Sequence, residues 1–166
     1  MEDQPGTREE LRRQLEEAGL GPNQTRVWLD SPTSYLSGLV PAEAITDPTT
    51  AARARNAVRR LIARLGDRVP DGVEVTSARV RDEGTFMLEL TFAWPGGTAV
   101  RHWDAEPYLY SSRAHEPLLS DRSRFTQLRI DNRTLSWPGD LDFAPEFLYA
   151  ESWAPDDGSV TGRPTR

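Results

Sequence analysis

Three carboxylates lie close together near the end of the chain, in the stretch WPGDLDFAPEFLY. Asp140, Asp142 and Glu146 could act as a general acid and base or hold a divalent cation. Local chemistry favours simpler roles. Asp140 follows a Pro-Gly turn, Asp142 precedes an expected helix start, and Glu146 lies in the first helical turn, where the helix dipole favours an anion. We therefore expect no catalytic residue and no metal ligand among these acids.

Few other side chains could carry catalysis. The chain has no cysteine and no lysine, which excludes disulfides, thiolate metal sites, a cysteine nucleophile and the lysine-dependent phosphate loop. Its two histidines, His102 and His115, show no spacing typical of a metal-ligand pair. No G-x-S-x-G motif marks a serine nucleophile. The sequence predicts a protein that is not an enzyme and uses no metal or cofactor.

A strongly basic helix is predicted by the stretch DPTTAARARNAVRRLIARLG, with Asp47 as its cap, Pro48 in its first turn and Gly66 at its end. Its apolar residues recur at helical spacing: Ala54, Val58, Leu61, Ile62 and Leu65. The same spacing predicts that five arginines face outward: Arg53, Arg55, Arg59, Arg60 and Arg64. This face could bind nucleic acid, remain solvated, or dock an acidic surface such as the second half of the chain.

The negative charge is concentrated in the second half. Residues 1–69 contain ten arginines and ten acids, whereas residues 70–166 contain ten arginines and sixteen acids, so the net charge of −6 resides in residues 70–166. An acidic surface repels nucleic acid and favours a basic protein partner, although acidity also serves solubility. No apolar run approaches the ~20 residues of a membrane span, and the start lacks the order of a signal peptide. We expect a cytoplasmic protein.

The elements that position these residues form two groups. Thr7 and Glu10 make a capping box for a first helix, whose inward residues are expected to be Leu11, Leu15 and Ala18. Pro22 and Pro41 open two more short helices. With the basic helix, these predict a small helical module over residues 7–68.

After GDRVPDG the apolar period becomes that of a strand, in the alternating residues Phe86, Leu88, Leu90 and Phe92. WPGGT turns the chain into a hairpin partner, TAVRHWD, and VEVTSARV, FTQLRI and TLSW predict further strands. Pro145 opens a last helix, expected to seal the core with five apolar residues: Trp137, Phe143, Phe147, Leu148 and Tyr149. The fold class is α+β: a small helical module followed by a small antiparallel-sheet domain at 73–153 closed by a C-terminal helix. Residues 154–166 should be a disordered tail.

Residues 73–152 carry a resemblance to a known family. An alternating strand, a glycine-containing turn, EPYL, EPLL and the closing WPGDLDFAPEFLY follow one another. In this order they resemble the uncharacterised bacterial domain family DUF twenty-four forty-two. The resemblance implies a compact α+β domain with a small antiparallel sheet and no established activity.

The first third has a second resemblance. Trp28, Leu29, Pro32 and Leu36 precede a short helix at Pro41 and a long amphipathic one. This order resembles the toxin-binding domain of the Xre, MbcA and ParS group of antitoxins, which implies binding of a toxin that resembles ADP-ribosyltransferases. Only about twenty-five residues precede the resemblance, too few for the complete DNA-binding domain of that group.

These observations lead to one main hypothesis and one alternative. We expect a non-enzymatic, antitoxin-like interaction module that binds a small, basic protein partner, such as a toxin. Its contacts are expected at five apolar positions: Trp28, Leu29, Tyr35, Leu36 and Leu39. The alternative is a DNA-binding transcriptional regulator that uses the arginines of the 48–65 helix.

Overall fold

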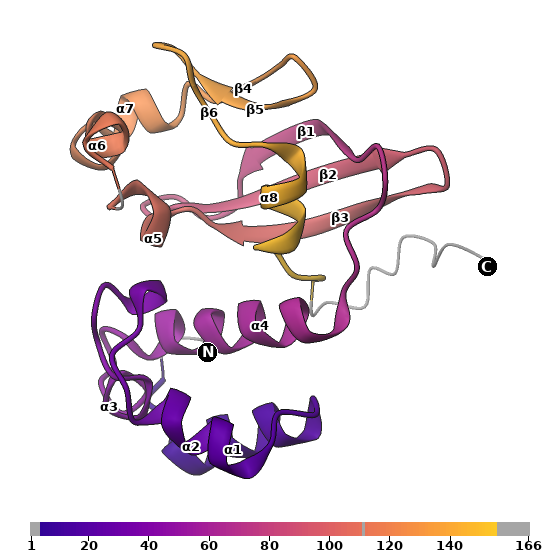
Figure 1. Cartoon of the computed structure of the whole chain (residues 1–166). Coiled ribbons are helices and arrows are strands. Elements are labelled where there is room, and N and C mark those ends of the chain that lie inside the picture. Colours follow the sequence, from indigo (N-terminus) through magenta and orange to yellow (C-terminus); the bar gives the residue numbers. More distant parts are fainter. Residues whose placement is uncertain (1–3, 111, 156–166) are drawn as a thin grey trace. The chain divides into compact units, whose positions relative to one another are not determined.

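The computed structural model of the chain describes residues 4–110 and 112–155 (Figure 1). The chain forms two compact units, with the boundary between Gly66 and Asp67. The first unit is helical, and the second combines two antiparallel sheets with short helices. The structure is therefore α+β, as the sequence predicts. Of the expected tail, only Ala154 and Pro155 lie within the described residues.

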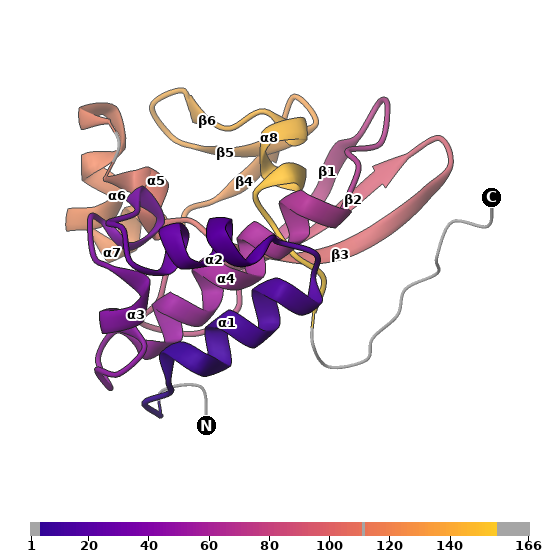
Figure 2. The same cartoon turned by 60° about the horizontal axis from the view of Figure 1, so that its bottom comes forward.

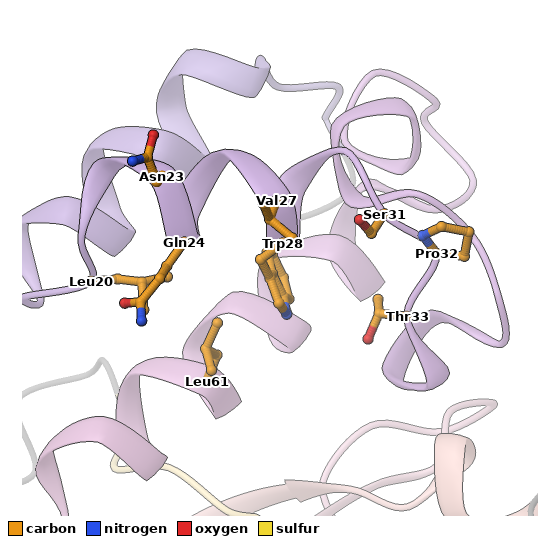
Figure 3. A pocket seen from close by; sticks show the side chains of 9 residues that line it. All are labelled: Leu20, Asn23, Gln24, Val27, Trp28, Ser31, Pro32, Thr33 and Leu61. Carbon is orange, nitrogen blue, oxygen red and sulfur yellow. The ribbon is translucent and has the colours of Figure 1, made fainter.

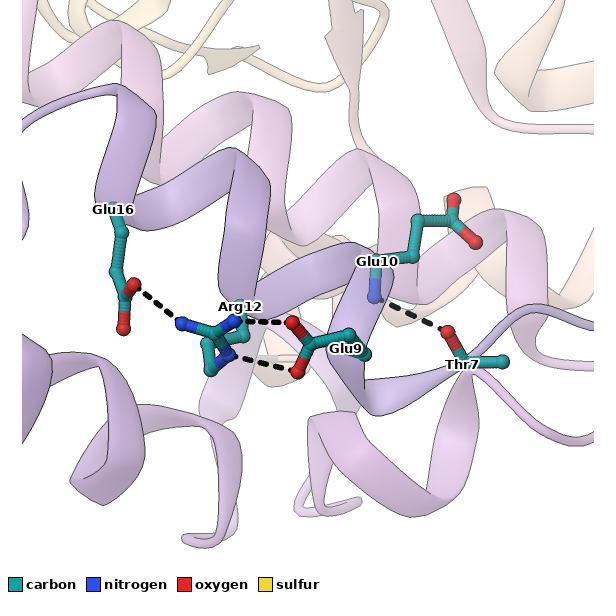
Figure 4. Close-up of polar contacts among 5 residues, drawn as sticks. All are labelled: Thr7, Glu9, Glu10, Arg12 and Glu16. Atoms are coloured by element: carbon teal, nitrogen blue, oxygen red, sulfur yellow. Dashed lines mark hydrogen bonds and ion pairs between the residues drawn. The ribbon is translucent and has the colours of Figure 1, made fainter.

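Helix α1 (Arg8–Glu17) begins where the sequence predicts a cap. The Thr7 hydroxyl accepts a hydrogen bond from the Glu10 backbone N–H at 3.1 Å (Figure 4). Two turns of the helix are bridged by Arg12, which donates to Glu9 and, at 2.5 Å, to Glu16. Exposed pairs at this spacing stabilise a helix by ~0.3–0.5 kcal/mol each. The Thr7 cap thus marks where α1 begins, and the pairs stabilise the turns that follow.

Four helical elements complete the first unit (Figure 2): α2 (Pro22–Leu29), the 3-10 helix η1 (Ser34–Leu36), α3 (Pro41–Ala44) and α4 (Ala51–Gly66). Their core includes the fully buried Leu11 and Leu15 of α1, packed with Ala54 and Val58 of α4. Ala18, expected to face inward, is exposed because α1 ends at Glu17 and Ala18 is its C-cap.

Helix α4 starts later than the sequence predicts. The Asp47 carboxylate accepts from the Thr49 backbone N–H at 2.8 Å and from its hydroxyl at 2.7 Å. These bonds close a local turn, a common alternative to helix for Asp. The Asp47 carbonyl then accepts from Ala51 N–H at 2.8 Å, and the helix begins at Ala51. Asp47 thus caps the turn that leads into α4.

The larger sheet of the second unit has the order β1 (Glu74–Val80), β2 (Met87–Trp94) and β3 (Gly97–Asp104), all antiparallel. The predicted alternation holds, because Leu88, Leu90 and Phe92 are fully buried on one face. Phe86, which precedes β2, is partly buried and packs against the same core. The predicted hairpin joins β2 to β3.

The smaller sheet contains β4 (Arg129–Asp131), β5 (Thr134–Trp137) and β6 (Leu141–Asp142). A backbone hydrogen bond from Val75 N–H to Arg133 C=O, 2.9 Å long, links β1 to the β4–β5 turn. The expected strand FTQLRI is wrong in its first half. Phe125 ends helix α7 (Arg122–Phe125), which Asp121 caps by accepting from the Ser123 N–H at 3.0 Å.

Three further short helices precede α7 in the connection between the two sheets: α5 (Glu106–Leu109), the 3-10 helix η2 (Arg113–His115) and α6 (Glu116–Ser120). Within the described residues, no helix has the length and apolar character needed to cross a membrane.

Helix α8 (Pro145–Ala150) closes the core of the second unit. The Tyr149 ring meets the Phe92 ring edge-on, with centroids 5.1 Å apart. The Trp137 indole N–H donates to the Phe125 carbonyl at 2.7 Å, and Phe143 packs edge-on against Trp103. Leu148 is buried as predicted, whereas Phe147 lies at the edge of the core: its ring packs on Phe143 and Tyr108, and its side chain remains 37% exposed. WPGDLDFAPEFLY is therefore a structural closure.

Candidate functional site

A hollow of about 570 Å³ lies on the first unit, over α2 (Figure 3). Its lining comes from the turn before α2, from α2, from the segment that follows it and from α4. The lining residues are Leu20, Asn23, Gln24, Val27, Trp28, Ser31, Pro32, Thr33 and Leu61. The size lies within the ~300–1,000 Å³ of ligand and anchor sites in proteins.

The two faces of α2 explain the hollow. Pro22 opens the helix, since its missing N–H costs nothing in the first turn. Thr25 and Leu29 are fully buried against the helical core. The opposite face bears Val27, which is 59% exposed, while Trp28 lies between the two faces, partly buried against the core and also lining the hollow. An eight-residue helix thus keeps an apolar surface on the side opposite its core contacts.

The segment after α2 forms one wall and is held by its own hydrogen bonds. The Thr33 carbonyl accepts from Gly38 N–H at 2.9 Å, and the Thr33 N–H donates to the Leu39 carbonyl at 3.2 Å. Ser37 and Gly38 adopt left-handed conformations, with φ of 54° and 87°. Glycine accepts this conformation without a steric penalty. The closed loop fixes Thr33 and the neighbouring Pro32 at the edge of the hollow.

The chemistry of the hollow suits binding rather than catalysis. Its floor and walls are apolar, with Trp28 and Leu61 side by side in the view of Figure 3. The polar members of the lining are amides and hydroxyls, and none of the lining residues is titratable at neutral pH. Such a surface can take an apolar anchor and offer amide hydrogen bonds at its rim. It contains no group for proton transfer.

The predicted partner residues divide into two groups. Trp28 lines the hollow. Leu29 and Leu36 are fully buried in the helical core, so assigning them as contact residues is wrong. Leu29 shares the buried face of α2 with Thr25, and Leu36 is the buried residue of η1, so their apolar area stabilises the fold. Tyr35 is partly buried, and Leu39 is 41% exposed but does not line the hollow.

Four apolar lining residues escaped the sequence reasoning: Leu20, Val27, Pro32 and Leu61. A signal was present. Leu20, Gln24, Val27, Trp28 and Ser31 fall at helical spacing and form a second stripe. Leu61 comes from α4, far along the chain, and only the packing of the helices brings it to this stripe.

The predicted arginine face of α4 is not an outward-facing row. Arg60 is fully buried, and its guanidinium lies over the Tyr35 ring at 4.9 Å from the centroid. Arg64 donates to the Tyr35 hydroxyl. Cation–π contact and the shared aromatic partner draw these side chains onto η1. The expectation that Arg60 faces outward is therefore wrong.

The remaining arginines of α4 also have local partners. Arg53 donates to the Ser37 hydroxyl at 3.2 Å, and Arg59 donates to the Asn56 side chain at 3.2 Å. Arg55 pairs with Glu10 of α1 at 3.1 Å and is only 17% exposed. This guanidinium lowers the pKa of the Glu10 carboxyl below its usual value. These arginines therefore make contacts within the helical unit, which account for much of the basic character of α4.

The three C-terminal acids do not form a site. Asp140, Asp142 and Glu146 are all exposed, and within residues 4–110 and 112–155 no group of three or more acids or histidines could hold a metal ion. Asp142 lies in β6 rather than directly before a helix, and α8 starts at Pro145 without a side-chain cap. Asp140 is left-handed, with φ of 58°, in the turn before β6.

Comparison with known proteins returned no match for this chain among protein-family models, curated proteins or solved structures.

Proposed function

We propose that this protein is a non-enzymatic interaction module whose first unit binds a small protein partner through the hollow over α2. One observation carries the proposal: an apolar surface remains beside a completed helical core. Val27 is 59% exposed while Thr25 and Leu29, on the same helix, are fully buried. An exposed apolar hollow with a polar rim is typical of a protein-binding site. Trp28 would be its central anchor, because buried aromatic side chains dominate many interfaces.

An antitoxin-like role is compatible with this surface, and it implies that the partner is a small, basic protein. The resemblance to antitoxin toxin-binding domains covers the same segment, Trp28 to α4. A basic partner such as a toxin would be steered by the acidic residues 70–166. Steering acts on the association rate and weakens with salt, whereas anchor burial acts mainly on dissociation.

DNA binding is the alternative, and the structure favours it less. Its surface would be the arginines of α4, of which Arg60 is buried and Arg55 pairs with Glu10. DNA binding would have a steep dependence on salt concentration, through counterion release.

The test is a substitution within the hollow that spares the fold. Val27→Asp places a charge on an exposed position of α2, and Val and Asp have similar helix propensities. The matched control is Ile130→Asp, a 37% exposed apolar residue in the second unit. Proteins captured from a bacterial lysate by the unaltered chain would be identified, expressed and measured by titration calorimetry against all three forms.

We expect Val27→Asp to weaken binding of the identified partner at least about tenfold, since an uncompensated charge in an apolar contact costs more than ~1.4 kcal/mol. Ile130→Asp should leave the affinity unchanged. Co-expression should relieve the toxicity of a toxin partner, and Val27→Asp should abolish that relief. Equal binding by Val27→Asp and the unaltered chain would refute the proposal, and retention of DNA by the α4 arginines would support the alternative.

A further inference from the structure

A second hollow, of about 520 Å³, lies within the sheet-containing unit. Pro117 and Leu118 of α6 form one side, and Leu141 of β6 lies in the lining with them. Two polar side chains, Arg124 and Gln127, complete the mainly apolar surface. This hollow shares no residue with the one over α2 and is not used by the proposed function.

A polar depression adjoins this hollow, since the two share Pro117 and Arg124. The depression is lined otherwise by charged and hydroxyl residues, among them Arg113, Glu116 and Ser120. An apolar hollow of ligand size thus adjoins a polar depression lined by two guanidinium groups and by the carboxylates of Glu116 and Asp121. This arrangement matches small-molecule sites, in which an apolar body is held by shape and a few polar groups set its orientation.

The local hydrogen bonds and ion pairs show which charged groups of the two hollows could bind a ligand. The Asp121 carboxylate accepts from the Ser123 N–H and hydroxyl, at 3.0 and 2.7 Å, and lies 3.5 Å from Nε of Arg124. Among the described residues, the terminal nitrogens of Arg124 make no hydrogen bond or ion pair. A guanidinium presents its donors in a fork that fits a carboxylate. The shared Arg124 is therefore placed to bind an anionic head.

We propose that the two adjoining hollows bind a small amphipathic monocarboxylate, with its apolar body against Leu118 and Leu141 and its carboxylate at Arg124. Arg113 would contribute a second cation at the polar end. The site lies wholly in the second unit, so its failure would leave the proposed protein-binding function untouched.

The His115 imidazole lies next to the second hollow and can report ligand binding by NMR. It is the last residue of η2, between the lining residues Ala114 and Pro117, and its ring stacks on Phe143 with centroids 4.9 Å apart. Phe143 lies two positions beyond the lining residue Leu141 in the chain. Burial lowers the pKa of His115, which favours the neutral imidazole. The chain has one other histidine, His102, in β3.

The experiment is an NMR titration of the full chain with sodium octanoate, followed through the two imidazole signals. We expect the His115 signal to shift and saturate at about 1 mM or below, with the His102 signal unchanged. Octanol, which lacks the carboxylate, should bind about tenfold more weakly, since a charge-assisted hydrogen bond is roughly twice as strong as a neutral one. Equal affinity for octanol and octanoate would refute the carboxylate assignment.

Two variants and a control locate the site. Arg124→Gln should weaken octanoate binding about tenfold, whereas Arg129→Gln, an exposed arginine of the same unit, should not. Ala114→Phe, at an exposed lining position, should obstruct the hollow and abolish the shift. The proposal is overturned if both histidine signals move together, if neither moves, or if Arg124→Gln and Arg129→Gln bind octanoate equally.

Discussion

Replacement of Arg101 by methionine should destabilise the second unit by about 3 kcal/mol. Arg101 is buried in β3 and holds the segment that follows α8. Its Nε donates to the Ser152 hydroxyl at 2.9 Å, and its Nη2 donates to the Ser152 carbonyl at 2.5 Å and to Asp67 at 2.9 Å. The guanidinium also lies over the Tyr149 ring, 4.4 Å from its centroid.

The magnitude follows from the burial of each contact. A hydrogen bond to a charged group contributes ~1.5–3 kcal/mol, and its loss leaves the Ser152 carbonyl without this donor. The stacking on Tyr149 adds ~0.5–2 kcal/mol. Asp67 is 44% exposed and returns to water, so its pairing contributes less than ~1 kcal/mol. Methionine keeps part of the alkyl packing and removes the desolvation cost of a buried cation, which lowers the total to about 3 kcal/mol.

Urea unfolding followed by tryptophan fluorescence measures this loss. In a Trp28→Phe background the four remaining tryptophans all lie in residues 67–166, so the signal reports the second unit. The control is Arg79→Met, whose side chain is 69% exposed and pairs with Glu89. It should cost less than ~1 kcal/mol. If Arg101→Met cost no more than this control, the argument that burial strengthens these contacts would be refuted.

Two further predictions concern a close contact and a titration. Gly6→Ala should destabilise the helical unit by ~1–3 kcal/mol, because the new methyl would lie 2.5 Å from Glu10 Oε2 and 2.9 Å from Ile45 Cγ1. The control is Gly66→Ala, which has open space around the new methyl and should leave stability unchanged or raise it. Thermal unfolding measures both effects. For His115, whose folded pKa is lowered by burial, the unfolded chain binds the proton more readily. Its contribution to stability should therefore be present above the usual pKa of ~6.5 and be lost as the pH falls through that value toward the folded pKa. An NMR-measured pKa of His115 at or above the unfolded value would contradict this.

Local rules account for the elements that the sequence predicts correctly. Thr7 caps α1, Pro22, Pro41 and Pro145 open helices, and the alternating residues of β2 face a core. In each case the information lies within a few residues, in a hydrogen bond, a missing N–H or a period of two. The predictions of element boundaries are wrong where the same residues can form another local structure, such as a turn or a short helix. Asp47, four residues before the start of α4, closes a turn, and Phe125 ends a helix rather than starting a strand.

The candidate site depended on distant parts of the chain. Trp28 stands out as an aromatic anchor in the sequence, but Leu29 and Leu36 are equally apolar, and only packing shows that they are buried. Leu61 reaches the hollow from α4. The arginines of α4 illustrate the same limit, because helical spacing gives the direction of a side chain but not what it meets.

The sequence by itself determined the absence of thiol and lysine chemistry, the charge of each half, the α+β class and the positions of most helices and strands, because composition and hydrogen bonds between near neighbours are sufficient for them. The tertiary structure decided which apolar residues form the core and which line a hollow. It also decided that Arg60 is buried, with its guanidinium over the Tyr35 ring. Burial is a property of contacts between segments far apart in the chain. A periodic pattern cannot specify these contacts, since one stripe of residues can face a core, a partner or water.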